Sequence, residues 1–242
     1  MGARSMPDAI WVLSGWVGVT AAAGLVGAGL ARGPVRWLWL ASALLLMVAY
    51  DALLTRGYGY IPLDFGPSDW NWEGKTLAVA LSLGVAAALG FRRSGVTLRH
   101  YRTGLPGALA LSAVLVAVFT GLALYFPGEP TTADTLAFQL TMPGLDEELF
   151  YRGVLLLMLN EAFGRPLSVL GAPMGWGALV SSVAFGLTHA LGYADGGFSF
   201  DATAMALTGG PALLLVWLRE KTGSLLLPIL LHNFANSIFH LI

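Results

Sequence analysis

The sequence predicts an all-α fold, a polytopic bundle of about eight transmembrane helices. Of the 242 residues, 56% are hydrophobic and only 11% are charged, whereas a soluble domain carries about 25% charged residues. Apolar runs of about 20 residues, the length that a helix needs to cross the hydrocarbon core, follow one another along the chain. We therefore expect a single integral membrane domain over residues 1–242.

The first four apolar runs, within residues 1–126, carry no motif that points to chemistry. They cover residues 9–31, 35–54, 75–91 and 105–126. The first run starts like a signal peptide, because Arg4 precedes it, but its unbroken length favours a retained helix. Between the second and third runs, Trp70-Asn71-Trp72 indicates an aromatic belt at the membrane interface.

The second group of runs forms a motif-bearing core over residues 140–242. Its members cover residues 140–163, 172–193, 200–218 and 223–242. A polar loop at residues 128–134 and a short amphipathic lead-in at 135–142 come before it, and Pro143-Gly144 is expected to break or kink the start of the fifth span. Pro228 lies four residues before His232 and is expected to bend the eighth helix.

Charge and cysteine content exclude several classes of function. The formal net charge of −1 gives no support to nucleic-acid binding. The absence of cysteine excludes disulfides, thiolate zinc sites and a cysteine nucleophile.

The distribution of basic residues predicts the orientation, since loops rich in Lys and Arg stay in the cytoplasm. The loops after spans one, three, five and seven carry nine such residues: Arg32, Arg36, Arg92, Arg93, Arg99, Arg102, Arg165, Arg219 and Lys221. The opposite side carries three: Arg4, Arg56 and Lys75. We expect a multi-pass protein of the cell membrane with both termini outside the cytoplasm. Its Ala, Gly and Leu content is typical of a bacterial protein, which points to the inner membrane.

Ionisable residues inside the expected spans are the strongest functional signal, because each costs roughly 3 kcal/mol in hydrocarbon. Glu148 and Arg152 are four residues apart, so they share a helix face and can form an ion pair. Glu147 is turned away and is left without that partner, and a carboxylate in a poorly hydrated site can act as a base. Tyr151 shares the face of Glu147. The Glu148 and Arg152 pair is expected to support helix packing.

The same spacing recurs in two later spans. Phe185 and His189 are four residues apart near the end of the sixth span, as are His232 and Asn236 in the eighth. If the spans alternate in direction, Glu147, His189 and Asn236 approach one membrane surface, which favours a common site. Taken singly, each polar residue could instead be an interhelical hydrogen bonder that holds the bundle together.

Three motifs in this order resemble those of the CPBP family, which comprises CAAX proteases and bacteriocin-processing enzymes. They are Glu-Glu-x-x-x-Arg at residues 147–152, Phe-x-x-x-His at 185–189 and His-x-x-x-Asn at 232–236. The resemblance covers about residue 140 to the C-terminus and shows no departure from the family patterns. It implies a helical intramembrane endopeptidase, commonly with eight spans, that cleaves a membrane-associated peptide or protein in the lipid bilayer.

The resemblance also implies a role for each motif residue. Glu147 would be the general base, and His189 would help to hold or polarise the water. His232 and Asn236 would stabilise the oxyanion, where positioned donors contribute a few kcal/mol in a water-poor cavity. Glu148, paired with Arg152, would support the site. No cofactor is expected on this reading.

Three alternatives remain open at this point. Glu147, His189 and His232 could hold zinc with an open position, as in a metalloprotease of the same family; the chain has no His-Glu-x-x-His, and the free base would then have to come from elsewhere. A non-catalytic immunity or scaffold protein would be expected to lose motif residues. A transporter would show repeated halves with broken helices. A prenylated peptide is one family precedent for the substrate, but a secreted or membrane-anchored peptide fits the expected orientation better.

Overall fold

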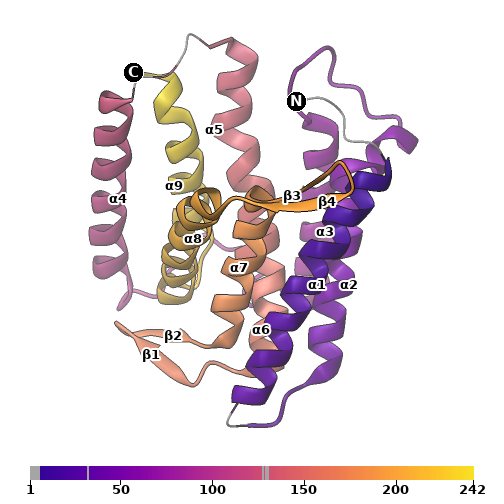
Figure 1. Ribbon diagram of the computed structural model, residues 1–242. Coiled ribbons are helices and arrows are strands. Elements are labelled where there is room, and N and C mark those ends of the chain that lie inside the picture. Colours follow the sequence, from indigo (N-terminus) through magenta and orange to yellow (C-terminus); the bar gives the residue numbers. More distant parts are fainter. Residues whose placement is uncertain (1–5, 32, 127, 129–130) are drawn as a thin grey trace.

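The computed structural model describes residues 6–31, 33–126, 128 and 131–242, which form a helical bundle (Figure 1). The first four helices agree with the first four predicted spans. They are α1 (Met6–Leu30), α2 (Trp37–Thr55), α3 (Trp72–Leu89) and α4 (Leu105–Tyr125), with a short 3₁₀ turn η1 (Gly57–Tyr60) after α2. The Asn71 side chain accepts a hydrogen bond from Gly74 N at 2.9 Å and so caps the start of α3. Arg4 and Arg32, which were counted in predicting the orientation, lie outside the described residues.

The fifth span is one long helical rod whose middle is widened. It consists of α5 (Ala133–Glu147), the π-helical segment η2 (Glu148–Leu155) and α6 (Leu156–Phe163). The rod starts earlier than predicted, because the Thr132 hydroxyl accepts from Thr135 N at 3.1 Å and caps the helix there. α5 continues through Pro143, so the helix is not broken at Pro143-Gly144, and the alternative of a kink there stays a prediction. An irregularity lies in η2, where hydrogen bonds span five residues.

The last three helices are α7 (Trp176–Ala190), α8 (Ala202–Thr222) and α9 (Leu226–Ser237), which is followed by the 3₁₀ turn η3 (Ile238–His240). Two β-hairpins that were not predicted from the sequence join α6 to α7 and α7 to α8. The strands are β1 (Leu167–Val169), β2 (Ala172–Met174), β3 (Leu191–Ala194) and β4 (Gly197–Phe200). β1 pairs with β2, and β3 with β4, both antiparallel. The predicted sixth span, residues 172–193, is therefore helical only over its central part.

Helix length separates the bundle into full and partial crossings. Among the described residues, α1, α2, α3, α4 and α8 are long and apolar enough to cross a membrane. α7 and α9, with 15 and 12 residues, rise only about 22 and 18 Å at 1.5 Å per residue. Both helices carry predicted site residues in their C-terminal halves. These residues therefore lie on helices shorter than the roughly 20 residues that span a bilayer.

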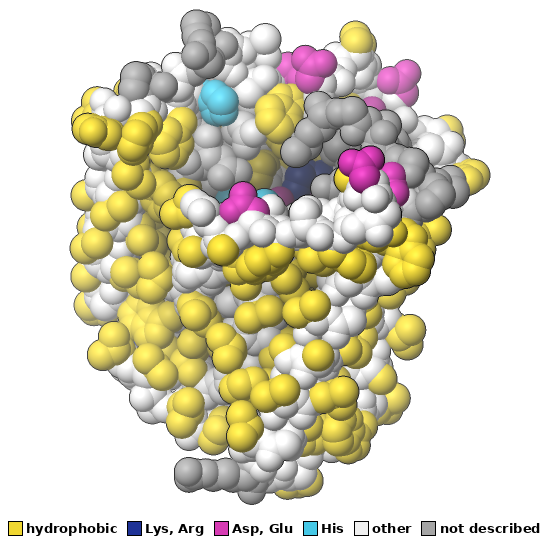
Figure 2. Space-filling model, viewed as in Figure 1, with side chains coloured by type: hydrophobic (Ala, Val, Ile, Leu, Met, Phe, Trp, Pro, Cys, Tyr) yellow, Lys and Arg dark blue, Asp and Glu magenta, His cyan; other side chains and the backbone are white. Residues whose placement is uncertain are grey.

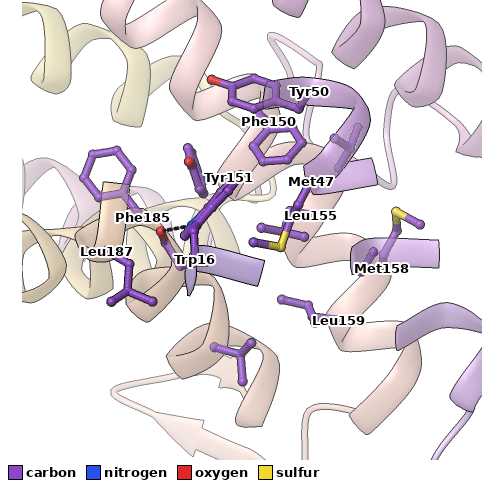
Figure 3. Close-up of a cluster of buried hydrophobic side chains, with 14 of the residues drawn as sticks. Trp16, Met47, Tyr50, Phe150, Tyr151, Leu155, Met158, Leu159, Phe185 and Leu187 are labelled. Atoms are coloured by element: carbon purple, nitrogen blue, oxygen red, sulfur yellow. Dashed lines mark hydrogen bonds between the residues drawn. The ribbon is translucent and has the colours of Figure 1, made fainter. Parts of the chain in front are cut away.

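The hydrophobic core joins the N-terminal helices to the motif-bearing part of the chain. Figure 3 shows Tyr50 of α2 against Phe150 of η2, with ring centroids 3.7 Å apart, and Trp16 of α1 beside Tyr151. The Trp16 indole donates a hydrogen bond of 2.7 Å to Ala184 O in α7. The two parts are therefore packed as one body around η2.

The surface and the loops agree with a membrane-embedded bundle. Hydrophobic side chains cover the lower part of the face in Figure 2, whereas acidic side chains gather near its upper end. α1 starts and α9 ends at that upper end (Figure 1). At the opposite end, Arg36 pairs with Glu161 of α6, and Arg165 pairs with Glu220 of α8 at 2.9 Å.

Candidate active site

A cavity of about 300 Å³ brings the three motifs together. Its wall includes Glu147 of α5, His189 of α7, and His232 and Asn236 of α9. Figure 2 shows a hollow behind the β3–β4 hairpin, with basic and histidine side chains in its depth. The rest of the wall is largely apolar and comes from α4, α5, α8 and α9, including Leu115, Phe119, Phe138, Leu207, Pro211, Leu215 and Leu231.

Glu147 lies between a cation and an imidazole. Its Oε1 accepts a hydrogen bond of 2.8 Å from Lys75 Nζ, while its Oε2 lies 3.6 Å from His232 Nε2. Oε2 has no hydrogen-bond partner among the described residues. The expectation that Glu147 is turned away from Arg152 agrees with this arrangement, but Glu147 is not without a cation, because α3 supplies Lys75.

Glu148 forms the predicted pair with Arg152 and has a second partner. Its Oε1 lies 2.9 Å from Arg152 Nη1 and 2.7 Å from His232 Nδ1. The tautomer of His232 that protonates Nδ1 donates this hydrogen bond, and the Glu148 oxygen accepts it. This contact fixes the imidazole ring and turns Nε2 toward Glu147.

Aromatic rings hold the charged groups in place. The Arg152 guanidinium lies over the Phe185 ring at 4.2 Å from its centroid, a favourable cation–π contact in a desolvated site. The Phe185 ring also makes edge-to-face contacts with two imidazole rings. The centroid distance is 5.0 Å to His189 and 6.0 Å to His232. Tyr151 is buried against Phe185, at 5.1 Å between centroids, and so supports the cluster from behind.

A close approach of α5 and α9 places His232 and Asn236. Gly144 N donates a hydrogen bond of 2.7 Å to Asn233 Oδ1. A Cβ added at Gly144 would lie 2.6 Å from that oxygen, so only glycine allows this contact. Asn233 is itself buried, whereas Asn236, one turn further along α9, faces the cavity.

A second cavity of about 260 Å³ lies between α1, α2 and α7. Trp16, Tyr50 and Thr188 contribute to its wall. Glu147 and His189 line both cavities and are the two residues that their walls share. These two side chains therefore separate a largely apolar space from a second one that contains several hydroxyl groups.

Four residues near the motifs were missed by the sequence reading: Lys75, Asp146, Tyr50 and Asn233. Asp146 is fully buried, and its Oδ2 accepts hydrogen bonds of 2.9 Å from both Lys75 Nζ and the Tyr50 hydroxyl. The sequence contained a signal for two of these four residues, Asp146 and Lys75. Three consecutive acidic residues in an apolar rod require cations nearby, and Lys75 stands at the start of an apolar run.

The side chains near the cavity do not fit a metal site. Among the described residues, no three or more His, Asp or Glu side chains are grouped so that they could hold a metal ion. In this arrangement His232 Nδ1 contacts Glu148, and one oxygen of Glu147 accepts a hydrogen bond from Lys75.

Comparison with known proteins gave one match. Residues 129–238 match the family model described as "Rce1-like: Type II CAAX prenyl endopeptidase Rce1-like". This stretch runs from the loop before α5 to the start of η3 and contains all three motifs. No curated protein and no solved structure matches the chain.

Proposed function

We propose, on the basis of the match of residues 129–238 to the Rce1-like family of CAAX endopeptidases, that the protein is an intramembrane endopeptidase that hydrolyses a peptide bond with water activated by Glu147. The family assigns a membrane protease; the reaction at this site is our proposal. The observation that carries it is the position of Glu147 in the cavity wall, where its buried Oε2 has no hydrogen-bond partner among the described residues and lies 3.6 Å from His232 Nε2.

In the proposed reaction, Glu147 Oε2 takes a proton from water as the water oxygen attacks the peptide carbonyl carbon. His189, beside Glu147 in the cavity wall, orients that water. The carbonyl oxygen becomes an oxyanion. The proton held by Glu147 then passes to the leaving nitrogen as the C–N bond breaks, giving a carboxylic acid and an amine. A positioned general base contributes roughly 10²- to 10⁴-fold to such a rate.

His232 and Asn236 are proposed to stabilise the oxyanion. The Asn236 amide and a protonated His232 Nε2 can donate hydrogen bonds into the cavity. Glu148 supports this role, because its contact with Nδ1 balances the charge of the imidazolium. Loss of one oxyanion donor costs roughly 10²- to 10³-fold in kcat.

The cavity wall favours a membrane-associated peptide as the substrate. Apolar side chains from four helices line most of it, and the ionisable residues gather at one part of the wall. A lipid chain on the peptide is compatible with such a lining and is one precedent in the family. We propose that substrate and enzyme meet within the lipid bilayer.

We also propose that the protein lies in a bacterial inner membrane with both termini outside the cytoplasm. The support is the arrangement of basic side chains at the end opposite the start of α1 and the end of α9. Arg36 and Arg93 both pair with Glu161 there, and Arg219 donates to Arg93 O. Basic loops of this kind remain on the cytoplasmic side.

The test is cleavage of a fluorescence-quenched peptide library in proteoliposomes, with lipidated and unlipidated members. Glu147→Gln, His189→Ala and His232→Ala should each lower turnover at least about 100-fold while the protein remains folded. Glu161→Gln removes an acid at the far end of the same rod and should retain activity. Full turnover by Glu147→Gln would refute the proposed mechanism.

A further inference from the structure

We propose that Lys75 is a positioning residue for the Glu147 carboxylate, and that the N-terminal helices thereby complete the active site. The inference rests on the proposed function, because it assigns Lys75 a part in preparing Glu147 for its reaction with water. α3, which carries Lys75, lies outside residues 129–238, the part of the chain that matches the family.

The contacts of Lys75 form a chain that starts in α2. Its ammonium donates hydrogen bonds to Glu147 Oε1 at 2.8 Å and to Asp146 Oδ2 at 2.9 Å. The Tyr50 hydroxyl donates to the same Asp146 oxygen at 2.9 Å. An ammonium group has three donors, so two consecutive carboxylates fill two of them. Asp146 is fully buried and the Lys75 side chain is 13% exposed, so solvent screens these contacts little.

These contacts determine which oxygen of Glu147 remains available. Lys75 holds Oε1, and Oε2 is then the oxygen on the side of His232. Without the lysine, the carboxylate could turn about its side-chain torsions and bond the imidazole instead. A misplacement of about 1 Å in a reacting group can lower the rate roughly 100-fold. The contact of Lys75 with Glu147 Oε1 is therefore expected to affect kcat more than it affects substrate binding.

The charges near Glu147 require a balanced test. Asp146, Glu147 and Glu148 are consecutive, and Lys75 and Arg152 are the Lys and Arg side chains within ion-pair distance of them among the described residues. Of the three acids, Arg152 pairs with Glu148. Replacing Lys75 alone would therefore leave Asp146 and Glu147 without a Lys or Arg partner, and the loss of charge would be mixed with the loss of position.

The test compares Asp146→Asn with the double variant Asp146→Asn/Lys75→Met. The double variant removes one negative and one positive charge, so the formal charge of the cluster equals that of the wild type. Relative to Asp146→Asn, it should lose about 100-fold in kcat, with KM changed less than about threefold because the apolar wall that binds substrate is intact. Lys221→Met, which removes a lysine at the opposite end, should behave as wild type.

A third variant, Lys75→Arg, keeps the charge and hence the fold. Its planar guanidinium is not equivalent to an ammonium and should move the Glu147 carboxylate, with kcat falling about tenfold, the order expected of a smaller misplacement. Wild-type kcat in Lys75→Arg, or equal kcat in the single and double variants, would overturn the inference. If the double variant does not fold, Lys75→Arg decides alone. Glu147→Gln is measured in parallel as the test of the proposed function, which fails if this variant is fully active. If Glu147→Gln is inactive and the double variant is as active as Asp146→Asn, only the role of Lys75 is refuted.

Discussion

Replacing Arg152 by methionine should lower the free energy of unfolding of the bundle. Arg152 is buried, lies 2.9 Å from Glu148 Oε1 and covers the Phe185 ring at 4.2 Å. Methionine keeps most of the volume but leaves the buried Glu148 carboxylate with His232 as its remaining partner. Breaking a buried ion pair by removing one member costs about 3–5 kcal/mol. The lost cation–π contact, up to about 2 kcal/mol, is included in that range because the two effects are not additive.

The free energy of unfolding can be measured by titrating the protein in detergent micelles with SDS and following tryptophan fluorescence. Arg165→Met is the matched control, since Arg165 also pairs with a glutamate at 2.9 Å, but its side chain is 43% exposed. That pair should contribute less than about 1 kcal/mol.

A neutral double variant separates the charge from the packing. Arg152→Met/Glu148→Gln leaves no unpaired charge, and the glutamine can still accept from His232 Nδ1. It should recover most of the stability that Arg152→Met loses. Equal losses in Arg152→Met and Arg165→Met, or a double variant as unstable as Arg152→Met, would show that this reasoning is wrong.

The remaining predictions concern packing, orientation and metal. Gly144→Ala should destabilise the protein by about 1–3 kcal/mol through overpacking against Asn233; Gly210→Ala, where nothing lies within 4 Å of an added Cβ, should not, and equal SDS unfolding curves for the two would contradict the close contact of α5 and α9. Because the chain has no cysteine, Arg99→Cys and Asp69→Cys can be labelled singly with an impermeant maleimide. Asp69→Cys should react from outside the cell and Arg99→Cys only after lysis; the reverse pattern would invert the orientation. Chelator dialysis should leave cleavage unchanged, whereas stoichiometric zinc whose removal abolishes cleavage would favour the metalloprotease alternative.

Local spacing was sufficient to predict the parts of the site that lie on one helix. Glu148 and Arg152 are neighbours on a single rod, so their pairing follows from helix geometry. The grouping of Glu147, His189 and Asn236 around one cavity followed from the alternation of spans. The first inference used only residue spacing within one helix. The second used the alternating direction of successive spans, which hydropathy locates.

Contacts between distant segments could not be predicted in this way. Lys75 was counted as a charge outside the bundle, because its run begins at that residue and no local rule connects it to Glu147. The structure connects them because α3 packs beside η2 and points the lysine inward. Similarly, the partnership of Asn233 with Gly144 depends on the approach of two helices 89 residues apart in the chain.

The hairpins were missed for a different reason. Residues 191–193 were assigned to the end of the sixth span and residue 200 to the start of the seventh, with 194–199 as their connection. Its turn, however, contains Asp195-Gly196, with φ of 52° and 78°. Asp-Gly with positive φ at both positions is the signature of a two-residue hairpin. Turn chemistry should therefore have outweighed hydropathy here.

The π-helical segment η2 sets the direction in which the side chains of α5 point relative to those of α6. α6 packs against α2 and α7, whereas η2 and the end of α5 face α3 and α9. A π-helical turn takes up more residues than an α-helical one, so the same residues wound as a regular α-helix would turn Glu147 by about 100° relative to α6. The acids would then point away from Lys75 and His232 while α6 stayed in place. The wide turn thus sets the direction of the acids independently of the segment that anchors them.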